Sequence, residues 1–129
     1  MFNGSVVEIQ THKNLHIVNF QVGKQTLCMM SLELPDNLHL NSKVQLYVKP
    51  THISIGKDVI GEISFASQLQ VKVKEIQKGT LVSSVTLVFD EYEFEAIVST
   101  KFIKKISIGD EVVAFIKASE LSIGKVLNV

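Results

Sequence analysis

The sequence has little of what marks several large classes of protein. Cys28 is the only cysteine among 129 residues, which excludes an intramolecular disulfide and a zinc site built from several cysteines. Basic and acidic side chains number 13 each, and a formal net charge of zero argues against a general nucleic-acid binder. No apolar run approaches the roughly 20 residues that a membrane-spanning helix needs.

The N-terminus and the composition predict a folded protein in a reducing compartment. Residues 1–4 contain neither a basic nor a long apolar segment, so we expect no secretory signal. Hydrophobic residues make up 46% of the chain and charged residues 20%, which is typical of a folded domain. We therefore expect a cytoplasmic protein without membrane attachment.

The apolar pattern is that of short β-strands. Val and Ile recur in short runs, proline occurs only twice, and no segment keeps a helical apolar period for three turns. Residues 81–89 and 91–96 each alternate between two faces, as half-buried strands do. Asp90-Glu91 between these runs, and Gly23-Lys24 in the first half, are predicted hairpin turns.

An internal repeat divides the chain. Residues 44–57 match residues 112–125 at an offset of 68, with six of fourteen pairs identical, including Ser-Ile-Gly-Lys at the end of both. Residues 8–10 match residues 75–77 at an offset of 67, so one inserted residue lies between the two anchors. Two matches in the same order indicate a duplication. We expect a first module over residues 1–60 and a second over 61–129, with 61–67 as a linker turn.

Each unit of about 60 residues predicts five short strands and one helical turn. The turn is expected over Leu32–Leu38, with Ser31 as N-cap, and over Thr100–Ile106, with Ser99 as N-cap. The predicted fold class is all-β, as two tandem OB-like small β-barrels. Units this small bury little core, so we expect them to pair tightly or to oligomerise.

Three segments carry a resemblance to a known family. Residues 96–99 and 109–119 (Gly-Asp-Glu-Val-Val-Ala-Phe-Ile-Lys-Ala-Ser) resemble the Mop module of the TOBE superfamily, and residues 63–69 are similar to its opening segment. Two such modules in tandem look like the di-Mop molbindins, which are small cytoplasmic oxyanion-binding proteins. The resemblance implies molybdate or tungstate as the bound ligand and no organic cofactor.

A tetrahedral dianion requires converging N–H and O–H donors and a cation. A serine hydroxyl at a helix start lies beside free N–H groups, and a lysine at a strand end adds positive charge. The resemblance therefore implies an oxyanion site at two repeated places. They are Ser99 with its counterpart Ser31, and Lys117-Ala118-Ser119 with its counterparts Lys49 and Thr51. A plain N-cap and a solvated lysine are the ordinary alternatives.

The third place implied by the resemblance is the opening turn, with Ser64, Ala66 and Ser67. Ala66 stands where the family has arginine, so one fixed positive charge is missing. In the first unit this turn would fall before Met1, and Pro50 removes one N–H donor there. We expect the first-unit site to be the weaker of the two. A simple inter-module linker is the ordinary alternative for the turn.

The sequence contains no catalytic motif. No Ser-His-Asp arrangement, P-loop or G-x-G-x-x-G is present. His12 and His16 are four residues apart, but on a strand this spacing separates them by about 13 Å, so we expect no metal site there. The expected function is therefore binding of the oxyanion for storage or homeostasis, not catalysis. The alternatives are a sensor acting on a separate protein partner and an interaction domain whose anion site has decayed.

The strands at Val44–Lys49 and Val112–Lys117 are apolar on both faces, as a strand covered from both sides is. This pattern predicts a homo-oligomer. The family resemblance favours a trimer, with a dimer as the second choice.

Overall fold

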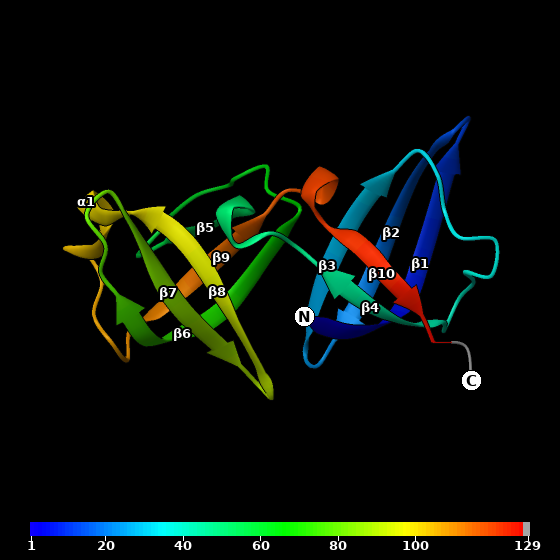
Figure 1. The fold of residues 1–129 in the computed structure, drawn as a ribbon. Helices are drawn as coiled ribbons and strands as arrows, with labels where there is room; N and C mark the ends of the chain where they lie inside the picture. The colour runs from blue at the N-terminus through cyan, green and yellow to red at the C-terminus, as the bar shows by residue number, and fades with distance from the viewer. Residues whose placement is uncertain (128–129) are drawn as a thin grey trace.

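The chain folds into two five-stranded antiparallel sheets that curl into adjacent barrels (Figure 1). The computed structural model describes residues 1–127. The first sheet has the order β10-β4-β1-β2-β3 and the second the order β5-β9-β6-β7-β8. The first is built from β1 (Phe2–His12), β2 (Leu15–Val22), β3 (Gln25–Ser31), β4 (Lys43–Tyr47) and β10 (Ser122–Val126). The second is built from β5 (Ile53–Gly56), β6 (Ser67–Gln77), β7 (Val82–Phe89), β8 (Tyr92–Ser99) and β9 (Glu111–Ile116).

Both predicted hairpins are formed. β2 and β3 are joined at Gly23-Lys24, and β7 and β8 at Asp90-Glu91. Gly23 has φ 59° and Asp90 has φ 50°, in the left-handed region that tight hairpin turns require. Along β7 the burial alternates residue by residue, and Ser83, Val85, Leu87 and Phe89 face the core as the period-2 pattern predicts.

The two barrels exchange their last strands. β5, from the first half of the sequence, pairs with β9 in the second sheet. β10, from the end of the chain, pairs with β4 in the first sheet. Each sheet thus takes four strands from one half of the chain and one from the other. The boundary between residues 60 and 61 stays a prediction about the duplicated sequence. Each sheet contains strands from both sides of this boundary.

The repeated glycine of Ser-Ile-Gly-Lys allows this exchange. A Cβ on Gly56 would lie 2.6 Å from Cε2 of Phe115 on the neighbouring β9. A Cβ on Gly124 would overlap the ring of Tyr47 on the neighbouring β4. Each glycine therefore leaves room for an aromatic ring of the other unit, at equivalent places in the two sheets.

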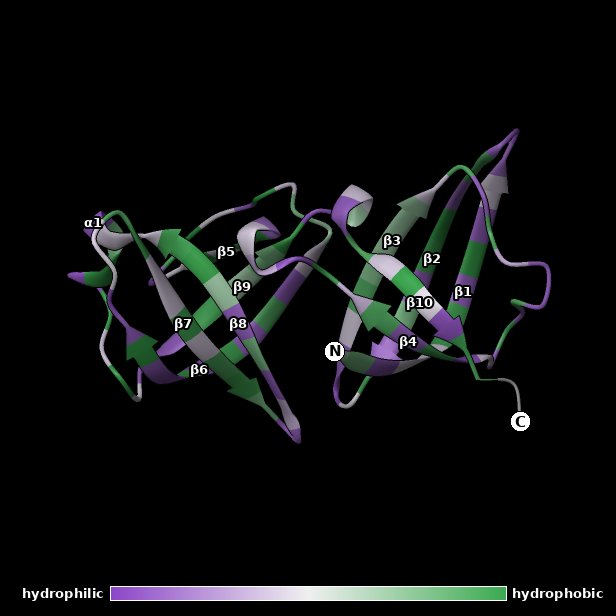
Figure 2. Cartoon of the chain, viewed as in Figure 1, coloured by the Kyte–Doolittle hydropathy of each residue, from purple (hydrophilic) through white to green (hydrophobic). Residues whose placement is uncertain are grey.

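Apolar side chains form one continuous core. Green apolar bands alternate with polar ones along the strands in Figure 2. The core crosses the junction between barrels, where the ring of Phe2 lies 6.0 Å from that of Phe89 and 5.1 Å from that of Phe94. The Tyr92 hydroxyl also donates to the carbonyl oxygen of Asn3 at 2.9 Å. The barrels therefore share a packed interface as well as two strands.

One of the two predicted helical turns is present. α1 (Thr100–Ile103) follows Ser99, whose hydroxyl accepts a hydrogen bond from the N–H of Lys101 at 3.3 Å. It ends three residues before the predicted Ile106. The turn expected over residues 32–38 is wrong, because that segment forms bends and turns. Pro35 removes one N–H and disfavours helical backbone at the residue before it.

Two 3-10 turns mark the places where the chain crosses between barrels. They are η1 (Pro50–His52) and η2 (Ala118–Glu120), each directly before an exchanged strand. The linker between β5 and β6 packs on the second barrel, with the Phe65 ring 5.2 Å from that of Phe115. Within residues 1–127, no helix has the length and apolar composition needed to cross a bilayer.

Candidate functional site

The crossovers carry the repeated lysine and its following hydroxyl. Lys117 is the N-cap residue of η2, and Lys49 is the N-cap residue of η1. Because the strands are exchanged, η2 packs against β3 of the first sheet and η1 against β8 of the second. A site at either crossover therefore combines residues from both halves of the chain.

Five of the predicted oxyanion ligands lie together at η2. A cavity of about 240 Å³ is lined by Met30 and Phe65 and by the predicted residues Ser64, Ala66, Lys117, Ala118 and Ser119. The linker residues 64–66 and the Lys-Ala-Ser residues 117–119, which are 53 residues apart in the sequence, thus meet at one surface. We refer to this as the η2 cavity.

The η2 cavity has the chemistry of an anion site. Among the residues that the structure describes, Lys117 is the only cation lining the cavity and no carboxylate lines it; the hydroxyls of Ser64 and Ser119 can donate. None of the ion pairs found within residues 1–127 involves Lys117, so its ammonium is available to a ligand. Met30, Phe65, Ala66 and Ala118 supply apolar lining, while the side chains of Ser64, Lys117 and Ser119 are exposed to solvent.

The cavity that Lys49 lines, between the two crossovers, is less suited to an anion. Lys49, Pro50 and His52 line a cavity of about 510 Å³, which also contains Glu120. The Glu120 carboxylate lies 2.8 Å from Nδ1 of His52 and puts negative charge beside the lysine. Thr51, predicted as the counterpart of Ser119, does not line this cavity.

The serines at strand ends have local partners. The Ser31 hydroxyl accepts from the N–H of Glu33 at 3.2 Å and donates to its carbonyl at 2.6 Å. It lines a third cavity, of about 310 Å³, together with Ser119. Ser99 caps α1 and lines none of the three cavities at the crossovers. The structure therefore brings neither serine into the η2 cavity.

Ser67 joins the two barrels. Its side chain is fully buried, and its hydroxyl accepts a hydrogen bond from the N–H of Cys28 on β3 at 3.0 Å. Beside it, Gln25 and Gln70 exchange two hydrogen bonds between side chain and backbone, at 2.9 and 2.7 Å. The predicted ligand Ser67 therefore links β6 to β3 and does not line the η2 cavity.

Sequence reasoning missed Met30 and Phe65. The Met30 side chain is 40% exposed beside the η2 cavity, whereas the neighbouring Met29 is buried. Met30 reaches Lys117 only because β3 packs against η2. No signal within the first unit indicates this contact.

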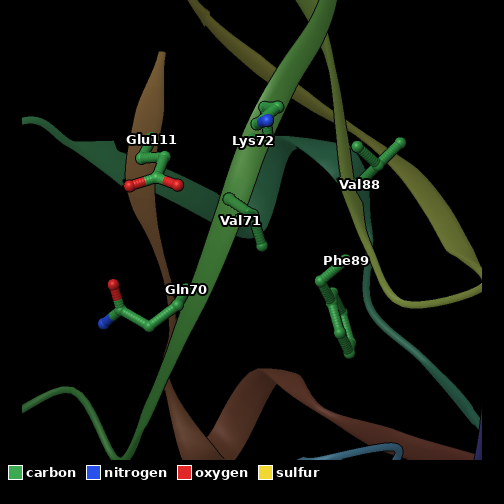
Figure 3. A pocket seen from close by; sticks show the side chains of 6 residues that line it. All are labelled: Gln70, Val71, Lys72, Val88, Phe89 and Glu111. Carbon is green, nitrogen blue, oxygen red and sulfur yellow. The ribbon is translucent and has the colours of Figure 1, made fainter. Parts of the chain in front are cut away.

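Another cavity, shown in Figure 3, is unsuited to a dianion. It has a volume of about 240 Å³, and the Glu111 carboxylate stands opposite Lys72 across paired strands. This carboxylate would repel an anion, and the remaining lining is Gln70, Val71, Val88 and Phe89. Within residues 1–127 no three His, Cys, Asp or Glu side chains are grouped to hold a metal ion.

Comparisons with known proteins identify the fold. The sequence matches no family model and no curated protein. The structure matches a crystal structure of ModG, described as a cytoplasmic molybdate-binding protein, in a form with molybdate bound. The TM-score is 0.89 at 24% identity, over 95% of this chain and 93% of that one. At this identity the likeness shows the fold, and it confirms the predicted pair of OB-like barrels.

Proposed function

We propose that this protein binds molybdate or tungstate as the intact oxyanion, for storage or homeostasis inside the cell. The η2 cavity carries the proposal, because its lining within residues 1–127 joins one lysine that forms no ion pair there with two hydroxyls and no carboxylate. The likeness to a structure that holds molybdate supports this choice of anion. The role is binding, with no bond made or broken.

The polar residues of the η2 cavity have different roles in binding the anion. The Lys117 ammonium neutralises part of the dianion charge, and the hydroxyls of Ser64 and Ser119 donate to its oxygens. Each charge-assisted hydrogen bond contributes about 1.5–3 kcal/mol, so three or four of them reach the roughly −8 kcal/mol of micromolar binding. A strong positive field over the whole protein is not required.

The size of the anion determines selectivity. Donors fixed on η2 and on the linker fit one oxyanion radius, and a smaller tetrahedral anion cannot contact all of them at once. We expect molybdate and tungstate to bind more tightly than sulfate and phosphate. Ala66, where the family has arginine, leaves the cavity with a single cation.

We also propose that the protein assembles into a homo-oligomer, a trimer first and a dimer second. One of the strands that are apolar on both faces is partly covered within the chain, because Phe65 packs against Phe115 on β9. Tyr47 on β4 stays 43% exposed, and Ile60 in the linker is 95% exposed. These side chains are available to a second copy. Light scattering at micromolar concentration tests this, and a monodisperse 14 kDa monomer would contradict it.

Isothermal titration calorimetry with molybdate, tungstate, sulfate and phosphate tests the ligand. Lys117→Met keeps most of the aliphatic stem and removes the charge, so molybdate affinity should fall roughly ten- to a hundred-fold. Lys125→Met is the matched control, because Lys125 is exposed on β10 and does not line the η2 cavity. Tighter sulfate than molybdate binding refutes the ligand class. An unchanged Lys117→Met variant refutes the site.

A further inference from the structure

Two segments that are far apart in the sequence form one end of the second barrel. The turn between β6 and β7 lies against the residues that follow β8. The N–H of Thr100 donates to the carbonyl oxygen of Leu81 at 3.0 Å, and its hydroxyl donates to that of Gly79 at 3.0 Å. In Figure 1 both segments lie beside α1, at the end of the molecule that faces away from the first barrel. We call residues 78–82 together with residues 100–109 the α1 end.

The α1 end carries positive charge without acidic partners. All four of its lysines are exposed, namely Lys78, Lys101, Lys104 and Lys105. None of them belongs to an ion pair found within residues 1–127. Residues 76–89 and 96–109 contain no Asp or Glu, and Asp110, the next carboxylate along the chain, is held by Lys57 at 2.9 Å. The four ammonium groups are therefore available to an anionic partner.

Large aliphatic side chains project beside these lysines. Leu81 is 81% exposed, Ile108 is 65% exposed, and Val82 at the start of β7 is 57% exposed. None of the four cavities described above is lined by a residue of the α1 end. Exposed apolar area among charges of one sign is characteristic of a surface that contacts a partner. Here the apolar groups are the tips of a projection and do not line those cavities.

The duplicated first unit shows that the fold does not require these charges. At an offset of 68, three lysines of the α1 end correspond to residues without positive charge: Lys101 to Glu33, Lys104 to Asp36, and Lys105 to Asn37. The backbone hydrogen bonds are nevertheless equivalent, because Leu38 donates to Pro35 as Ile106 donates to Ile103. The positive charge is thus particular to the α1 end and is not a consequence of folding.

We propose that the α1 end docks on the surface of an anionic lipid bilayer. The aliphatic tips enter the headgroup region, and the lysine ammonium groups bind lipid phosphates. Lysine suits this role, because its long stem packs beside apolar groups while the ammonium stays in the polar layer. The expectation of a protein without membrane attachment rests on the lack of a spanning or leader segment, and a peripheral contact requires neither.

The composition favours a lipid surface over an acidic protein as the partner. Interfaces between proteins are enriched in aromatic side chains and arginine and depleted in lysine. All 13 basic residues of this chain are lysines, and the most exposed apolar side chains of the α1 end are aliphatic. Because the chain as a whole has no net charge, attraction to an anionic surface acts through this end and orients the molecule.

Docking at the α1 end is independent of the η2 cavity. η2 connects β9 to β10 at the junction of the barrels, whereas α1 lies at the far end of the second barrel (Figure 1). Membrane docking and oxyanion binding can therefore be measured separately, and either can fail without the other.

Flotation of the full chain with lipid vesicles tests the proposal. The parent should bind phosphatidylcholine vesicles that contain phosphatidylglycerol, and it should not bind vesicles of phosphatidylcholine alone. Binding should weaken as the salt concentration rises. A triple variant with Lys101→Gln, Lys104→Gln and Lys105→Gln should lose roughly a hundredfold in vesicle affinity, since each lysine near an anionic surface contributes about fivefold.

The matched control changes three exposed lysines outside the α1 end, with Lys13→Gln, Lys24→Gln and Lys125→Gln. It alters the net charge equally and should bind vesicles like the parent. Circular dichroism and molybdate titration on both triple variants verify the fold and the η2 cavity. Equal loss of vesicle binding in the two triple variants overturns the proposal, because attraction is then a matter of total charge.

A single tryptophan reports which end enters the headgroup region, because the chain contains none of its own. In Leu81→Trp the fluorescence should shift to shorter wavelength on anionic vesicles, as the indole leaves water. In Leu40→Trp, at the first-unit position equivalent to Ile108, it should not shift. A shift in Leu40→Trp alone overturns the placement. A parent that ignores anionic vesicles, or that binds poly-glutamate more tightly than vesicles, overturns the proposal.

Discussion

Gly56 and Gly124 show how a single residue type can permit strand exchange. Each lies on an exchanged strand beside an aromatic ring of the other unit, where any side chain would collide with that ring. The Ser-Ile-Gly-Lys repeat identifies these positions in the sequence as a duplication. It does not reveal that each glycine faces the opposite unit.

Gly124→Ala should therefore destabilise the protein. The added methyl group would overlap the Tyr47 ring and force it outward, at a cost of about 1–3 kcal/mol in the free energy of unfolding. Urea denaturation measures this cost. In a Tyr47→Ala background, Gly124→Ala should lower the free energy of unfolding much less, because the Tyr47 ring is no longer there to collide with the added methyl group. Equal costs in the two backgrounds would show that the ring is not the reason.

The ion pair between Lys57 and Asp110 makes stability depend on pH. Lys57 Nζ donates to Oδ2 of Asp110 at 2.9 Å, and the N–H of Ser107 donates to the same oxygen at 2.9 Å. Lys57 first, and then Ser107, hold the pKa of Asp110 below its ordinary value of 3.8. The hydrogen bond to Asp110 raises the pKa of Lys57 above 10.5.

A carboxyl with a depressed pKa stabilises the fold above its unfolded pKa, and this stability is lost as pH falls through the folded pKa. We expect Lys57→Met to be less stable than the parent at pH 7. The difference should shrink below pH 3.8, as Asp110 takes up a proton, and also above pH 10.5, as Lys57 loses one. Urea unfolding of both proteins across this range measures it. A difference that stays constant below pH 3.8 would mean that Asp110 does not cause it.

At the scale of elements, local patterns predict local structure well. The alternation over residues 81–89 and the turn at Asp90-Glu91 give β7, its hairpin and its buried face. The helical turn over 32–38 fails at Pro35, although a proline in that position is visible in the sequence. Ser99 is confirmed as the N-cap of α1, whereas Ser31 is followed by no helix and only forms local hydrogen bonds with the backbone of Glu33.

The pairing of strands that are far apart in the sequence cannot be predicted in the same way. β5 and β10 carry the same Ser-Ile-Gly sequence, so either satisfies the sheet of either unit. The sequence therefore cannot specify which strand joins β4 and which joins β9. For the same reason the sequence does not predict every residue of the η2 cavity. Lys117, Ser119 and Ser64 are predicted from family resemblance, whereas Met30 lines the cavity because strand exchange brings β3 next to η2.

Ser99→Ala tests the cap at the start of α1. Loss of the hydrogen bond from the N–H of Lys101 should lower the free energy of unfolding by about 1 kcal/mol. Molybdate affinity should change far less than in Lys117→Met, because Ser99 does not line the η2 cavity. Parallel thermal unfolding and calorimetric titration check both. A large loss of affinity in Ser99→Ala would place the anion at α1 instead.

At the scale of the whole molecule, exchange makes each barrel depend on both halves of the chain. Residues 1–60 contain four strands of the first sheet, and β10 completes it at the edge beside β4. The same fragment contains β5, which in the intact chain pairs only with β9. The buried Phe2 ring and the Gln25–Gln70 hydrogen bonds add further contacts between the halves. Unfolding of the intact protein should therefore be a single cooperative transition.

Separate fragments of residues 1–60 and 61–129 test this dependence. Alone, each has one strand without its partner and one exposed sheet edge, so neither should fold as a stable monomer. When mixed, each supplies the strand that the other lacks, and a one-to-one complex with the circular dichroism of the intact protein should form. Gly124→Ala in the second fragment should weaken that complex, because its β10 must pass the Tyr47 ring of the first. A fragment that folds alone as a monomer would show that β5 or β10 pairs within its own half, and that exchange is not what holds the barrels together.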